Sequence, residues 1–192
     1  MMILDVENFK KAKITLGLIT INVVFFILFN ILLGVEYLLL FSQINSKVFE
    51  GQIYRLFTAM FLHADIIHLF SNMLALLIFG TSVENNFYKY QFLLIYFVSG
   101  FLGNIFSLFL LPYDSISLGA SGAIFGLIGA VFVFFAREDK SFILFGLIYL
   151  VFFIFMSFAP GINLWAHLFG LLGGLILGYL FKNKTKRFEY YE

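Results

Sequence analysis

Six long apolar segments dominate the chain and leave few folds open to it. Each has roughly the 17 to 25 residues that a helix needs to cross the hydrocarbon core of a bilayer. They cover residues 14–33, 66–82, 92–111, 118–136, 142–158 and 162–181. Only 12% of the residues are charged, against about 25% in soluble domains. We therefore predict an all-α membrane protein, a six-transmembrane-helix bundle in the lipid bilayer, with residues 1–192 forming a single domain.

Charge and cysteine content exclude several classes of function. The formal net charge is +1, so no basic face is available to neutralise the phosphates of a nucleic acid. The chain has no cysteine, which excludes disulfides, thiolate metal sites and a cysteine nucleophile. We predict neither a metal nor another cofactor. The oligomeric state stays open.

Lysine and arginine lie unevenly around the apolar segments. One side of the membrane would carry only Lys47 and Arg55. The other side would carry Lys10, Lys11, Lys13, Lys89, Arg137, Lys140, Lys182, Lys184, Lys186 and Arg187. Basic residues gather on the cytoplasmic side of membrane proteins. We therefore predict a multi-pass protein of the cell membrane with both termini in the cytoplasm.

The first connection, residues 34–65, is too long for a simple link between packed helices. It alternates aromatic and charged residues, as in Tyr54-Arg55-Leu56-Phe57, a pattern that suits a structure lying in the membrane interface. We predict a long interfacial first loop, and a flexible extracellular loop is the alternative.

Polar groups within the apolar segments fall at one depth. At about 1.5 Å per residue from the cytoplasmic ends, Ser121 and His167 lie roughly 22 and 21 Å up. His68 and Asn72, in the second segment, lie roughly 24 and 18 Å up. The four groups thus share a layer about a third of the way into a core roughly 30 Å thick.

Two faces rich in glycine predict which helices meet. Gly122, Gly126 and Gly129 share a face of the fourth segment. His167, Gly170, Gly174 and Gly178 share a face of the sixth. Small residues let helix backbones approach closely in lipid, so we expect these two segments to pack together and bring Ser121 beside His167.

A serine and a histidine at one depth suggest nucleophilic catalysis. Gly119-Ala120-Ser121-Gly122 alone is a weak signal, since most serines in apolar helices bond back to a carbonyl of the preceding turn. Ionisable groups inside a membrane are functional by default. No Asp or Glu lies within the apolar segments, which favours a Ser-His dyad with the imidazole oriented by packing, unless Asp65 or Asp114 folds in from a loop.

These motifs closely resemble the rhomboid family of intramembrane serine proteases. The residues that carry the resemblance are Gly119-Ala120-Ser121-Gly122, Ala166-His167-Leu168-Phe169-Gly170, the spaced set His63, His68 and Asn72, and Glu84 after Gly80. The resemblance implies Ser121 as nucleophile and His167 as general base. It also implies oxyanion or substrate stabilisation by His68, Asn72 and the backbone at Gly119 and Ser121. His63 is expected to be structural.

Two positions depart from the family pattern. Tyr54-Arg55 stands where the family often has Trp-Arg, which weakens the expected anchoring of the first loop. Phe125 stands where a Tyr is common, and its ring is expected to pack on His167 without offering a hydroxyl.

The fifth segment, residues 142–158, is rich in Phe and has one Gly. Without a small-residue face it cannot pack as closely as the fourth and sixth segments. We expect this segment, or the loop around Pro160 as the resemblance suggests, to move and admit substrate.

The sequence thus predicts a protease whose partners are transmembrane substrates. Two rivals remain. One is a non-catalytic binder of transmembrane helices with the same fold. The other is a transporter or proton conductor using His68 and His167, which the apolar inner halves of the fourth and sixth segments disfavour.

Overall fold

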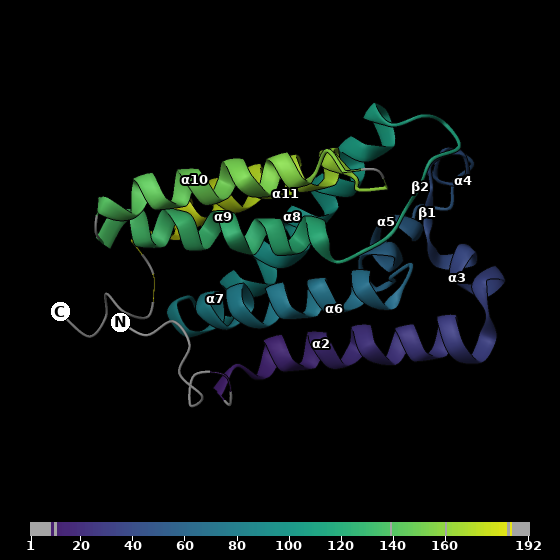
Figure 1. Cartoon of the computed structure of the whole chain (residues 1–192), viewed down its shortest axis with the longest axis horizontal. Helices are drawn as coiled ribbons and strands as arrows, with labels where there is room; N and C mark the ends of the chain where they lie inside the picture. Colours follow the sequence, from purple (N-terminus) through teal and green to yellow (C-terminus); the bar gives the residue numbers. More distant parts are fainter. Residues whose placement is uncertain (1–8, 10, 139, 160, 184, 186–192) are drawn as a thin grey trace.

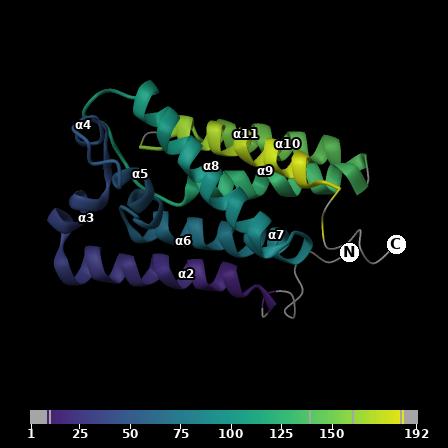
Figure 2. The same ribbon diagram turned by 180° about the vertical axis from the view of Figure 1, so that it is seen from behind.

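The computed structural model describes residues 9, 11–138, 140–159, 161–183 and 185. Pro160, Lys10, Lys184, Lys186 and Arg187, which entered the predictions above, lie outside this part of the chain. The chain is mostly helical. The long helices run side by side, and the short elements gather at one end of the bundle (Figure 1, and from behind in Figure 2).

Four helical stretches are long and apolar enough, by length and composition, to cross a membrane. The first is α2 (Lys13–Phe26), which continues as the π-helix η1 (Ile27–Leu33). The second joins α6 (Ile66–Ala75), the π-helix η3 (Leu76–Gly80) and α7 (Thr81–Asn86). The third and fourth are α8 (Lys89–Leu110) and α11 (Leu164–Phe181). Two further apolar helices are α9 (Ser121–Glu138), whose apolar part Ser121–Arg137 is shorter than these stretches, and α10 (Ser141–Met156), with 16 residues.

The helix limits differ from the predicted segments by a few residues. The second helical stretch ends at Asn86 and not at residue 82, because the polar residues of α7 turn inward and are buried. Helix α9 starts at Ser121 and not at residue 118, since Gly119 has a φ of +134°, which lies outside the helical range. The pattern of apolar residues alone indicates neither the buried polar residues of α7 nor the later start of α9.

Residues 34–65 form several short elements. They are α3 (Val35–Phe41), β1 (Gln43–Ile44), α4 (Asn45–Phe49), α5 (Arg55–Thr58) and the 3-10 helix η2 (Ala59–Phe61). Strand β1 pairs antiparallel with β2 (Ile116–Ser117), and this pairing places Gln43 opposite Ser117. Arg55 is 4% exposed, and its guanidinium donates to the carbonyl oxygens of Leu39 and Ser42, both at 2.6 Å. This region is therefore held by buried polar contacts even with Tyr in place of Trp at position 54.

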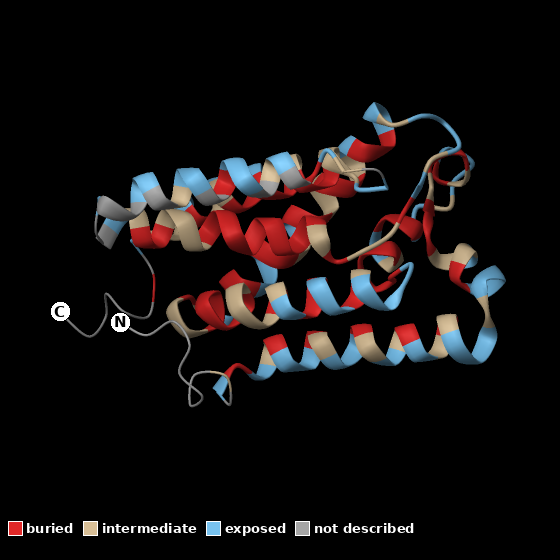
Figure 3. Ribbon diagram, viewed as in Figure 1, coloured by how far each residue is buried: buried red, intermediate tan, exposed pale blue. Residues whose placement is uncertain are grey.

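Helices α9 and α11 pack backbone against backbone, as predicted from their glycines. A Cβ on Gly170 would overlap the carbonyl oxygen of Gly122, and one on Gly174 would overlap that of Gly126. Helix α9 is buried without a break from Gly122 to Ala130 (Figure 3). This contact fixes the position of Ser121 relative to His167.

Helix α10 lies on the outside of this pair, with most of its described side chains exposed (Figure 3). Gly146 is its close contact with α9, since a Cβ there would overlap the ring of Phe132. Leu150 is buried, and Ser157, in the turn after the helix, is 2% exposed. Helix α10 is thus attached over a narrower strip than α11.

Candidate active site

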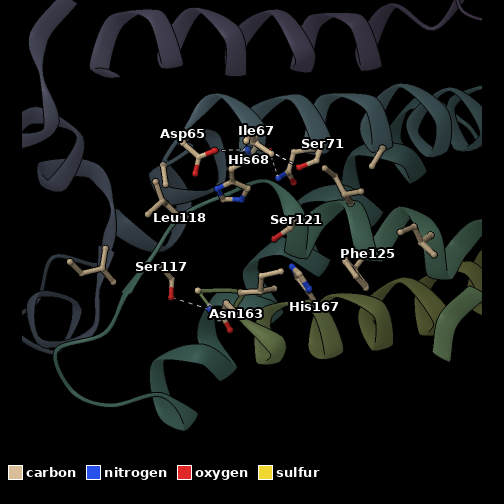
Figure 4. A pocket seen from close by; sticks show the side chains of 18 residues that line it. Asp65, Ile67, His68, Ser71, Ser117, Leu118, Ser121, Phe125, Asn163 and His167 are labelled. Carbon is tan, nitrogen blue, oxygen red and sulfur yellow. Dashed lines mark hydrogen bonds between the residues drawn. The ribbon is translucent and has the colours of Figure 1, made fainter. Parts of the chain in front are cut away.

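A cavity of about 790 Å³ opens between α6, the segment leading into α9, α9 itself and the start of α11. Its lining includes four of the predicted site residues: Ser121, His167, His68 and Asn72. Figure 4 shows the Ser121 side chain between the rings of His68 and His167. The structure therefore brings together side chains from three helices that are far apart in the sequence.

Ser121 is the first residue of α9. Its backbone N–H lies in the first turn, where a helix provides no carbonyl partner. Just before it, Gly119 has a φ of +134°, a conformation that disfavours side chains. The Gly119 N–H donates to the carbonyl oxygen of Ala59 at 2.9 Å. The chain thus enters α9 through a turn that this hydrogen bond holds in place. The helix itself provides no carbonyl partner for the Ser121 N–H.

His167 lies in the first turn of α11 and is 8% exposed. Asn163 caps this helix by accepting the N–H of Ala166 at 3.0 Å, and its amide nitrogen lies 3.0 Å from Ser117 Oγ. The imidazole stacks on the ring of Phe125, with centroids 4.2 Å apart and planes inclined by 11°. This confirms the expected packing of Phe125 on His167.

The Nδ1 atom of His167 lies 2.7 Å from Ser157 Oγ. Ser157 is not among the predicted site residues, because the prediction relies on packing alone to orient the ring. The one indication in the sequence is that Ser157 is a polar residue near the end of the apolar segment 142–158. Asp65 does not take this place, since it caps α6 by accepting the N–H of His68 at 2.8 Å.

No hydrogen bond joins Ser121 to His167 in the described part of the chain. Catalytic hydrogen bonds are often long in unliganded sites and tighten when substrate binds. A change in the serine rotamer is the rearrangement that would join them, because both side chains already line the same cavity.

His68 and Asn72 form the wall opposite His167. The Asn72 amide donates to the His68 carbonyl oxygen at 2.8 Å, and an amide nitrogen has a second hydrogen to donate. Gly119 makes room for His68, since a Cβ at position 119 would lie 2.9 Å from His68 Nε2 and 3.8 Å from Ser121 Oγ. These groups surround the serine with hydrogen-bond donors.

His63 lies behind this wall, outside the membrane-crossing stretch that starts at Ile66. It is fully buried, and its ring centroid lies 5.0 Å from that of His68. Neither ring nitrogen has a hydrogen-bond partner among the described residues. Burial, and to a smaller extent the neighbouring His68, lower the pKa of His63 to about 3, with Asp65 opposing part of the shift. His63 is therefore a neutral packing group behind His68.

Within the described ranges, no three His, Cys, Asp or Glu side chains cluster closely enough to hold a metal ion.

Comparison with known proteins identifies the family. The rhomboid domain model matches residues 50–184. The chain is 40% identical over 150 residues to the putative rhomboid protease YdcA of Bacillus subtilis, covering 74% of each protein. It is 42% identical over 145 residues to RHOMBOID-like protein 6, mitochondrial, of Arabidopsis thaliana, covering 70% of the chain and 46% of the relative.

A third relative, rhomboid protease GluP of Bacillus subtilis, is 43% identical over 99 residues, covering 52% of the chain and 19% of the relative. The chain thus spans about three quarters of one bacterial relative and less than half of the other two. With a domain match over most of its length and several apolar helices that could cross a bilayer, this chain is a multi-pass membrane protein that belongs to the rhomboid family.

Proposed function

We propose that the protein is an intramembrane serine endopeptidase that cleaves transmembrane substrates near the outer membrane face with a Ser121-His167 dyad. The observation that supports this most is that Ser121 and His167, from α9 and α11, line one cavity with His68 and Asn72 opposite them. Relatives named as rhomboid proteases support the same reaction class.

In this mechanism Ser121 Oγ attacks the carbonyl carbon of the scissile peptide bond. Nε2 of His167 takes the hydroxyl proton and then gives it to the leaving amine, so that an acyl-enzyme and a new amino terminus result. The same nitrogen then takes a proton from water as the water oxygen attacks the ester carbon. When the bond from the acyl carbon to Ser121 Oγ breaks, Nε2 returns this proton to Oγ, and the new carboxyl terminus leaves.

The negative charge that develops on the carbonyl oxygen needs donors already in place. We assign this role to the second amide hydrogen of Asn72, the His68 ring and the N–H of Ser121. The N–H of Gly119 is not assigned this role, because it already donates to Ala59. Gly119 contributes instead the space that lets His68 approach the serine.

We also propose that α9 and α10 cross the membrane, which gives six spans in one domain. From Ser121 to Arg137, α9 rises about 24 Å, so an inner end at the cytoplasmic interface leaves Ser121 below the outer surface of a core roughly 30 Å thick. The distribution of Lys and Arg supports cytoplasmic termini in the cell membrane. Substrates would present a locally unwound segment at this depth, since a closed helix hides its carbonyls.

The rival function is a non-catalytic binder of transmembrane helices, and the missing hydrogen bond between Ser121 and His167 is the observation that favours it. Labelling of purified protein with a fluorophosphonate probe separates the two. We expect labelling of the native protein and of Ser71→Ala, a serine that lines the same cavity. We expect none for Ser121→Ala or His167→Ala. Absence of labelling in folded native protein, together with no cleavage of a transmembrane reporter, would favour the binder.

A further inference from the structure

We propose that Ser157 is a positioning residue for His167: its hydroxyl accepts the Nδ1–H and holds the neutral imidazole in the tautomer whose Nε2 lone pair is free for Ser121. The inference rests on the proposed function, because only a general base needs that tautomer. It gives the dyad a third member that comes from the end of α10 and not from an acidic side chain.

The contact itself is short and shielded. Ser157 Oγ lies 2.7 Å from His167 Nδ1. The two residues are 2% and 8% exposed, respectively. A buried hydrogen bond in a region of low dielectric is stronger than one in water. Little solvent therefore competes for Nδ1 while this bond is made.

Two contacts together fix the orientation of the ring. Stacking on Phe125, at 4.2 Å between centroids, restricts the plane of the imidazole but allows the two ring orientations that are related by a flip about χ2. The bond from Nδ1 to Ser157 selects one of these two orientations. Neither contact alone defines where Nε2 points.

The direction of the hydrogen bond follows from the chemistry of the base. A neutral imidazole carries one proton, and the nitrogen without it is the base. If Ser157 donated to Nδ1, the proton would sit on Nε2 and His167 could not accept the proton of Ser121. A hydroxyl can accept as well as donate, so Ser157 fits the productive tautomer.

Ser157 also makes the base depend on a third helix. It lies in the turn that follows α10, where α10 approaches the start of α11 (Figure 1). Most described side chains of α10 are exposed, and Ser157 is an exception. Displacement of this end of α10 would break the hydrogen bond to His167 Nδ1, and the imidazole could then carry its proton on either nitrogen.

The first test compares steady-state cleavage of a transmembrane reporter by Ser157→Ala, Ser157→Thr and the native protein. Loss of one hydrogen bond of this kind is expected to lower kcat about 3- to 10-fold with KM unchanged. Ser157→Thr, which keeps the hydroxyl, should recover most of this loss. Ser99→Ala is the matched control, because Ser99 is equally buried and its hydroxyl has no partner among the described residues.

The second test reads the tautomer directly and needs no catalysis. Nitrogen-15 NMR of protein labelled at its three histidines reports which ring nitrogen carries the proton, and His167→Gln assigns the signals of His167. We expect Nδ1–H in native protein and in Ser121→Ala, and a mixture of tautomers in Ser157→Ala.

The outcomes separate the two proposals. If the His167 tautomer is the same with and without the Ser157 hydroxyl, or if kcat of Ser157→Ala stays within twofold of native, the positioning role is wrong. If the tautomer changes as expected while native protein neither labels with fluorophosphonate nor cleaves the reporter, the contact holds and the protease proposal fails.

Discussion

At the scale of single residues, the site depends on how closely His68 approaches the chain before Ser121. The absent side chain of Gly119 provides this space, and its φ of +134° fits the turn that enters α9. His63 supports His68 from behind as a buried neutral ring. The position of His68 in the cavity thus relies on the space at Gly119 and on the His63 ring behind it.

Gly119→Ala is expected to lower turnover at least about tenfold, because a Cβ only 2.9 Å from His68 Nε2 forces that ring away from the serine. Reporter cleavage in detergent micelles measures the effect. The matched control is Gly51→Ala, where φ is +100° and nothing lies within 4 Å of the added Cβ. Equal losses in both variants would assign the effect to backbone strain and contradict the steric explanation.

His63 is expected to make stability depend on pH. Its folded pKa of about 3 lies below the ordinary 6.5, so the unfolded state binds more protons as the pH falls through this window. Stability is therefore lost on acidification, by about 1.4 kcal/mol for each unit of pKa difference expressed. Unfolding in mixed micelles at about pH 7.5 and about pH 4.5 should show a smaller loss for His63→Phe than for native protein. Identical losses would show that other groups set the dependence.

Sequence reasoning placed the four principal site residues well for a physical reason. The rise of a helix is regular, so counting residues gives depth, and glycine faces predict which helices pack together. Ser157 was not predicted because it lies in the turn after α10, where neither the regular rise of a helix nor a glycine face indicates the position of a side chain. The bond to His167 depends on how α10 and α11 are joined, which the pattern of apolar residues does not specify.

At the scale of elements, the contact between α9 and α11 determines the geometry of the site. Gly170 and Gly174 of α11 lie so close to Gly122 and Gly126 of α9 that a Cβ on either α11 glycine would overlap a carbonyl oxygen of α9. The strength of such an interface is van der Waals packing of backbones, since lipid provides no hydrophobic drive between helices. Separation of these helices would also separate Ser121 from His167.

Gly174→Ala is expected to destabilise the protein by about 2 kcal/mol or more, because the new methyl group overlaps the Gly126 carbonyl of a neighbouring helix. The free energy of unfolding in mixed micelles measures this. Gly17→Ala on α2 is the control, with nothing within 4 Å of its Cβ. It should leave stability unchanged or raise it by up to about 1 kcal/mol, since Ala favours helix more than Gly. A stable Gly174→Ala variant would show that the two helices can move apart without loss.

At the scale of the whole molecule, a buried carboxylate joins the first helix to the rest of the bundle. Glu84 in α7 is 5% exposed and accepts the N–H groups of Ile14 and Thr15 at 2.9 and 2.8 Å. The hydroxyl of Thr15 donates to it at 2.8 Å. The carboxylate therefore satisfies the start of α2, where helix N–H groups lack partners. Apolar patterning predicted both helices but not this connection, which depends on how their ends align.

Glu84→Ala is expected to cost about 3 kcal/mol or more of unfolding free energy, because three donors to a charged acceptor lose their partner in a buried place. Limited proteolysis near the start of α2, alongside unfolding in mixed micelles, should show that this helix detaches first. Glu50→Ala removes an exposed carboxylate paired with Lys47 at 2.8 Å and should change stability by less than about 1 kcal/mol. Equal effects of the two substitutions would mean that Glu84 does not hold α2.

The small sheet of β1 and β2 has a consequence for protein engineering. It pairs Gln43 with Ser117, a short distance along the chain from Ser121, while the Gln43 amide also donates to the Asn104 carbonyl oxygen of α8 at 3.0 Å. The connection after the first helix therefore helps to hold the segment that leads to Ser121 in position, besides linking two helices. In a chimaera that takes residues 34–65 from another protein, the contacts that hold the segment before Ser121 would be replaced as well, and we expect the position of this serine to change.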